Sequence, residues 1–259
     1  MPSAFEWATT QSLYIIGTIS STSNLSTESE RCLGLSGDTN NDSFKISITS
    51  NPIFGFTIGA TRRLLQTVSH IGSLFVLRQS KYRITDADVD FCKRSLEACD
   101  DLFSNGTAWE NGDLYRDSAR SPYRTSVVQH QLKAFLAAAY IFMHRSLLDA
   151  TPHEVRPYVV QVFEAVDEFF NLRGGNFSLW PAFIAATEAC EGEDIAAANR
   201  WLERAMRVGM GNRLRAKVVI EEVWRRRQDV SKASDIPLNG CRIDWRDVMM
   251  DLDIDILLI

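Results

Sequence analysis

The stretch SLWPAFIAATEACEGEDIAAANRWLERAM, residues 178–206, decides the fold class of this 259-residue chain. Apolar side chains recur every three or four residues on both sides of an acidic turn, which is the period of an α-helix. Pro181 falls in the first turn, where its missing N–H costs little. The stretch therefore predicts a helical hairpin, in which Ser178 is the N-cap of the first helix and Gly192 ends it.

The same period continues through most of the remaining sequence. It predicts further helices over residues 51–77, 85–103, 125–148, 151–170, 212–228 and 243–259. No segment makes a convincing strand. We therefore expect an all-α fold, a helical-hairpin array or irregular bundle, as one domain over residues 51–259. Residues 1–50 are rich in Ser, Thr and Asn, and we expect a poorly ordered N-terminal segment there.

Three glycines punctuate this pattern at positions that affect the expected helices. Gly59 lies inside the apolar period of residues 51–77, where it would permit a close contact with a neighbouring helix. Gly209 and Gly211 follow the hairpin and are expected to end its second helix. Asn212 is then the expected cap of the next helix.

Charge is unevenly distributed along the chain, whose formal net charge is −5. Residues 199–227 hold nine Arg or Lys against three Glu, and residues 244–255 hold five Asp against one Arg. The favoured interpretation is a set of helix faces that complement each other in the fold. The alternative is a basic patch for a phosphate or nucleic-acid partner, although the net acidity of the chain does not favour nucleic acid.

The cysteines indicate neither a disulfide framework nor a metal centre. The chain has five cysteines at wide spacings and no CxxC pair. Such a pattern fits a reducing compartment, and we expect Cys92 and Cys99 to be small core residues on one helix face. The longest apolar runs fall short of the roughly 20 residues that a membrane span requires.

The residues give no catalytic, cofactor-binding or metal-binding set. None of the four histidines belongs to an HExxH motif, and there is no GxSxG motif. Asp86 and Asp88 have the spacing of a magnesium site, but a helix N-terminus explains them better. Asp251 and Asp253 share that spacing without further carboxylates to complete a site. The sequence therefore favours a protein without catalysis and leaves an enzyme open.

Large aromatic side chains recur through the last eighty residues, and two histidines share a face of the helix expected over residues 125–148. These residues either form the core or line a pocket for a small apolar effector. The candidate residues are His130, His144, Trp180, Phe183, Trp201, Trp224 and Trp245.

The order of these elements resembles a known family. Five features follow one another in the last eighty residues. They are Trp180-Pro181 with Phe183, the helix of Trp201, the Gly209-x-Gly211-Asn212 turn with its Arg-rich helix, Glu222-x-Trp224, and Trp245 with Val248-Met249. Together they resemble the C-terminal end of the fungal-specific transcription factor regulatory domain. That domain lies downstream of a Zn₂Cys₆ binuclear-cluster segment in its family.

The resemblance implies an α-helical regulatory domain that acts in the nucleus, with the cytoplasm as the alternative. It implies binding to other transcription proteins or to a small apolar effector, no membrane association and no cofactor, and it leaves a homodimer open. DNA contact would need a compact basic segment with six cysteines, which this sequence lacks. The alternative function is a stand-alone helical protein that binds or acts on a small apolar metabolite. Whether the chain is a fragment or a complete protein stays open.

Overall fold

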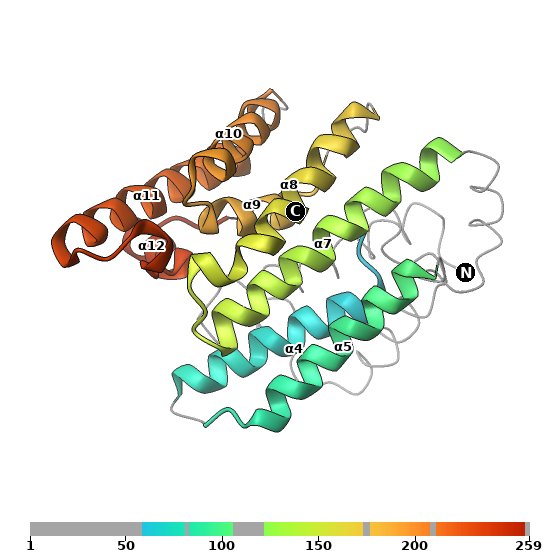
Figure 1. Ribbon diagram of the computed structural model, residues 1–259, viewed down its shortest axis with the longest axis horizontal. Coiled ribbons are helices and arrows are strands. Elements are labelled where there is room, and N and C mark those ends of the chain that lie inside the picture. Colours follow the sequence, from blue (N-terminus) through green and yellow to red (C-terminus); the bar gives the residue numbers. More distant parts are fainter. Residues whose placement is uncertain (1–58, 81–82, 106–121, 173–176, 208–210, 257–259) are drawn as a thin grey trace. The chain divides into compact units, whose positions relative to one another are not determined.

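α-Helices account for the regular secondary structure, apart from one short 3₁₀ turn, in the residues that the computed structural model describes: 59–80, 83–105, 122–172, 177–207 and 211–256. The helices (Figure 1) are α4 (Arg62–Gln79), α5 (Asp86–Ser104), α7 (Pro122–Leu147), α8 (Pro152–Asn171), α9 (Leu179–Glu188), α10 (Gly192–Met206), α11 (Gly211–Ser234) and α12 (Trp245–Asp251), with η1 at Leu238–Gly240. No strand occurs in these ranges, so the predicted all-α fold class is confirmed. The poorly ordered segment predicted for residues 1–50 lies outside them.

Backbone contacts divide the chain into two units, Met1–Leu132 and Lys133–Ile259, and α7 passes from the first into the second. The expectation of a single domain over residues 51–259 stays a prediction. Within the described helices, none is long and apolar enough to span a membrane.

In the first unit, α4 and α5 pack against each other. The predicted N-terminus of α5 is confirmed, because Thr85 and Asp88 form a capping box in which each side chain accepts a hydrogen bond from the backbone of the other. Cys92 and Cys99 are buried on one face of α5, as expected for core residues.

The expected start of the first helix is wrong. Residues 51–58 lie outside the described part, and α4 begins at Arg62, where the hydroxyl of Thr61 accepts a hydrogen bond from Leu64 N at 3.3 Å. Gly59 precedes the helix in a left-handed conformation, with φ of 75°. A helix cannot continue through that backbone geometry, so Gly59 lies in a turn and not inside a helix. The close contact expected of Gly59 is nevertheless present, because Gly59 approaches Gln131 of α7.

The second unit is organised around α9, in which all ten residues are buried. This helix contacts α8, α10 and α11. The middle of α7 is also buried on nearly all sides over residues 134–139, as its apolar sequence predicts. A capping box of Thr151 and Glu154 begins α8, where the sequence places a helix start.

The hairpin begins where the sequence predicts and its turn differs from expectation. Ser178 is the N-cap residue of α9, as predicted, although its side chain makes no capping hydrogen bond. The helix ends at Glu188 because Ala189 turns into an extended conformation, and Gly192 begins α10 instead of ending α9. Side chains from α11 satisfy carbonyl groups at this end of α9, so no glycine cap is needed there.

The start of α11 and the end of α12 also differ from the predicted positions. Gly211 and Asn212 are the first residues of α11, so Asn212 is not its cap. The last helix, α12, covers Trp245–Asp251 and is much shorter than the predicted 243–259. Asp253, at φ of 52°, turns the chain out of the helix.

Candidate functional site

Most of the aromatic residues singled out from the sequence lie in the interior of the second unit. Trp180 is completely buried, and its ring stacks on Phe135 with centroids 5.4 Å apart and meets Phe142 edge-on at 6.0 Å. Phe183 packs edge-to-face on Trp245 at 5.2 Å. These contacts hold α7, α9 and α12 together, which is the core role expected of large rings.

The remaining candidates do not join that cluster through these ring contacts. Trp201 is buried on α10, and His144 lies against Tyr158 of α8 with ring centroids 5.6 Å apart. His130 belongs to the part of α7 that lies in the first unit. The effector pocket expected from these residues stays a prediction.

Trp224 has a specific polar role at the C-terminal end of α9. Its indole Nε1–H donates a hydrogen bond to the carbonyl of Ala186 at 2.9 Å. One turn along α11, Arg227 donates from Nη2 to the carbonyl of Thr187 at 2.8 Å and from Nη1 to that of Ala189 at 3.0 Å. The last carbonyls of a helix lack intrahelical partners, and a cation there also complements the helix dipole. Two side chains of α11 thus cap a buried helix end.

Replacing Trp224 by Phe keeps most of the ring but removes the donor to Ala186. We expect a loss of about 1–2 kcal/mol in the free energy of unfolding, because a buried carbonyl loses its hydrogen bond. Urea denaturation followed by tryptophan fluorescence measures the loss. A Trp224→Phe protein as stable as the wild type would show that this bond is not a stabilising cap.

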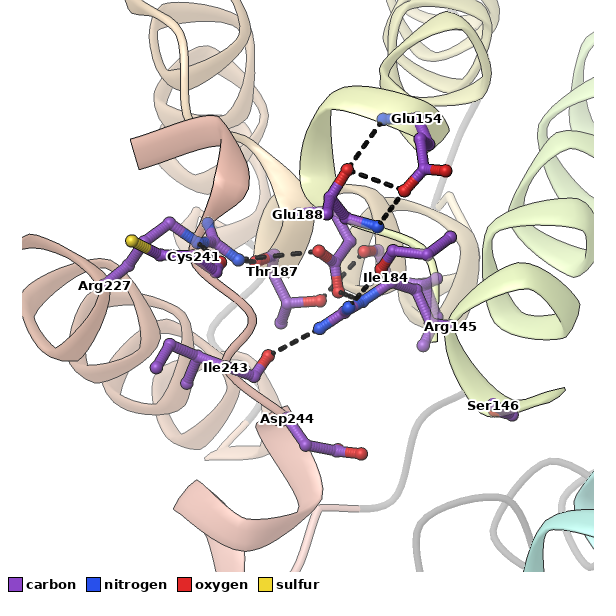
Figure 2. A network of polar contacts seen from close by, with 12 residues as sticks. Arg145, Ser146, Glu154, Ile184, Thr187, Glu188, Arg227, Cys241, Ile243 and Asp244 are labelled. Atoms are coloured by element: carbon purple, nitrogen blue, oxygen red, sulfur yellow. Dashed lines mark hydrogen bonds and ion pairs between the residues drawn. The ribbon is translucent and has the colours of Figure 1, made fainter. Parts of the chain in front are cut away.

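A buried carboxylate between two arginines forms the centre of the polar site (Figure 2). Glu188, at the end of α9, accepts a hydrogen bond from Arg145 Nε at 2.8 Å and pairs with Arg227 Nη2 at 3.5 Å. The side chains of Glu188 and Arg227 are each only 2% exposed. We call Arg145, Glu188 and Arg227 the buried triad.

The arginines of the buried triad also bind backbone carbonyls of distant segments. Arg145 donates to the carbonyls of Ala150 and Ile243, the latter at 3.1 Å. Arg227 Nε donates to the carbonyl of Cys241 at 3.3 Å. The buried triad therefore ties α7, α9 and α11 to the segment that leads into α12.

Burial and pairing act in opposite directions on the protonation of these arginines. Burial lowers the pKa of Arg227, and Glu188 opposes that effect. Burial also disfavours the charged form of Arg145, but the Glu188 carboxylate and its hydrogen bond raise the pKa of Arg145 above its ordinary value. The single carboxylate of the triad offsets one of its two positive charges, and backbone carbonyls bind the remaining guanidinium donors.

A third arginine, Arg246 of α12, is buried beside the triad's segment. Its Nη1 pairs with Asp244 at 3.0 Å, and its Nη2 donates to the hydroxyl of Ser146 at 2.9 Å. The guanidinium also lies over the rings of Phe142 and Trp245, at 5.0 Å and 4.8 Å from their centroids. Stacking on both rings suits the planar guanidinium and anchors α12.

The charged groups of this site bind one another and groups of the surrounding backbone and side chains. The buried arginines bind carboxylates and carbonyls, and burial raises the pKa of the nearby Cys190 thiol to about 11, which keeps it protonated at neutral pH. Within the described ranges, no group of three or more His, Cys, Asp or Glu side chains is arranged to hold a metal ion.

The basic run of residues 199–227 is matched by acidic side chains, as its favoured interpretation predicts. Arg200 and Arg204 both pair with Asp167 of α8, at 3.1 and 2.9 Å. Arg226 pairs with Asp251, so the basic and acidic runs of the sequence meet. These contacts neutralise part of the basic run within the fold.

Glu222 is expected to make stability depend on pH in acid. Hydrogen bonds from Arg225 and Arg226 hold the pKa of Glu222 at about 2, below its ordinary value of 4.5. The folded state therefore binds the proton more weakly than the unfolded state, and the stabilisation present above pH 4.5 is lost as pH falls toward about 2.

Because the pair with Arg225 is at the surface, we expect Glu222→Gln to cost less than about 1 kcal/mol at neutral pH. The variant should also show a shallower loss of stability between pH 4.5 and 2 than the wild type, measured by urea unfolding at each pH. Identical pH profiles for the two proteins would contradict the proposed role of Glu222.

The sequence reasoning missed the buried triad and Arg246. One signal was present for Arg227, because it continues the buried stripe of α11 formed by Ala216, Ile220 and Val223. Glu188 similarly ends a helix whose other residues are nearly all apolar. A charged residue at a core position of a helical pattern indicates a buried ion pair, but the pattern does not identify its partner.

The fold and this site define an α-helical domain stabilised by an aromatic interior and buried arginines. The chain belongs to the family described as fungal specific transcription factor domain, whose sequence model matches residues 3–259. The family resemblance stated from the sequence is thereby confirmed, and membership assigns the chain a role in transcription regulation. Neither curated proteins nor solved structures gave a significant match to this chain.

Proposed function

We propose that this chain is the regulatory module of a fungal transcription regulator, that it acts in the nucleus by binding partner proteins or an effector, and that it has no catalytic activity. The observation that carries the proposal is the family match over residues 3–259. The partners that fit best are other transcription proteins. The contacts of the buried arginines support the proposal, because these arginines stabilise the interior. Partner proteins would therefore bind to the surface of the domain.

Contact with DNA in the manner of this family requires a zinc-cluster segment, which this sequence lacks. A binuclear cluster needs six cysteines close together, whereas this sequence has five at wide spacings. The four described cysteines are buried and free: Cys92, Cys99, Cys190 and Cys241. The proposed module therefore regulates transcription through contacts other than its own cysteine-bound zinc.

A small apolar effector is the second part of the proposal. The aromatic rings of the second unit supply the apolar surroundings that such a ligand needs, with the His144–Tyr158 pair as a polar edge. An effector that binds there would raise the unfolding temperature, and the rise would increase with the logarithm of the effector concentration above its dissociation constant. Thermal shift measurements test effector binding separately: a candidate effector should raise the unfolding temperature of the wild type more than that of His144→Ala.

Tethering the full chain to an unrelated DNA-binding domain in a fungal host tests the main proposal. We expect transcription of a reporter to change relative to the DNA-binding domain alone. The same fusion carrying Glu188→Ala, which is expected to destabilise the second unit, should show a weaker effect at equal protein level. A reporter that responds equally to the fusion and to the DNA-binding domain alone would overturn the proposed function.

A further inference from the structure

We draw no further inference here: the strongest candidate, the exposed apolar face of α11 at Leu214 and Val218, carries none, because nothing in the described part of the chain shows what covers it.

Discussion

Replacing Glu188 by Ala is expected to cost the second unit about 3–5 kcal/mol of unfolding free energy. Glu188 is the carboxylate that lies between Arg145 and Arg227, and its side chain is 2% exposed. Without it, two arginines stay in the interior with their charge unbalanced. Urea denaturation followed by tryptophan fluorescence measures the effect, because Trp180, Trp201 and Trp245 are buried in this unit.

Two further variants separate the loss of charge from other effects. Glu188→Gln retains the shape and one acceptor oxygen but removes the charge, so it should fall between wild type and Glu188→Ala. Asp229→Ala removes an exposed partner of Arg225 and should cost less than about 1 kcal/mol. If Glu188→Ala were as mild as Asp229→Ala, the buried triad would not be an important source of stability.

Gly59→Ala is expected to destabilise the first unit by about 2 kcal/mol or more. Gly59 has φ of 75°, a conformation that side chains with a Cβ rarely adopt. An added Cβ would also lie 2.2 Å from Cβ and 2.7 Å from the carbonyl carbon of Gln131, so the backbone of α7 would have to move. Faster hydrogen exchange of the α4 amides, measured by mass spectrometry, would report the loss.

Gly192→Ala is the matched control for this prediction. A Cβ at Gly192 meets no atom within 4 Å, and the residue begins α10, where alanine favours the helix. We expect Gly192→Ala to be neutral or slightly stabilising. If the two alanine variants gave equal exchange in α4, the left-handed turn at Gly59 would not constrain the first unit.

The sequence predicted best what local interactions determine. The starts of α5 and α8 were correct because each depends on a Thr and an acidic residue three positions later, which form a capping box within one turn. The start of α4 was wrong because the apolar period runs through Gly59 without interruption. The close approach of Gly59 to Gln131 involves a residue far along the chain, and no local pattern reveals it.

The contacts of the buried triad also join residues far apart in the sequence, which a local pattern cannot predict. Glu188 binds Arg145, 43 positions before it, and Arg227, 39 positions after it. Periodicity could place Arg227 on the buried stripe of α11 but could not select its partner. The aromatic residues were anticipated as core or pocket; Trp180 and Phe183 are buried and make ring contacts, and the pocket stays a prediction. The prediction that a glycine ends α9 was also wrong, because the side chains of Trp224 and Arg227 cap the end of this helix.

The charges buried in the second unit are structural, and Glu188 stabilises the fold by pairing with both Arg145 and Arg227. The direct measurement is a double-mutant cycle in urea with Glu188→Ala, Arg227→Met and the two combined. Removing Arg227 removes one of the charges left unbalanced by the loss of Glu188, so the combined loss should be smaller than the sum by about 1–3 kcal/mol. If the losses of unfolding free energy in the two single variants simply added up in the double variant, Glu188 and Arg227 would not stabilise the fold through their interaction.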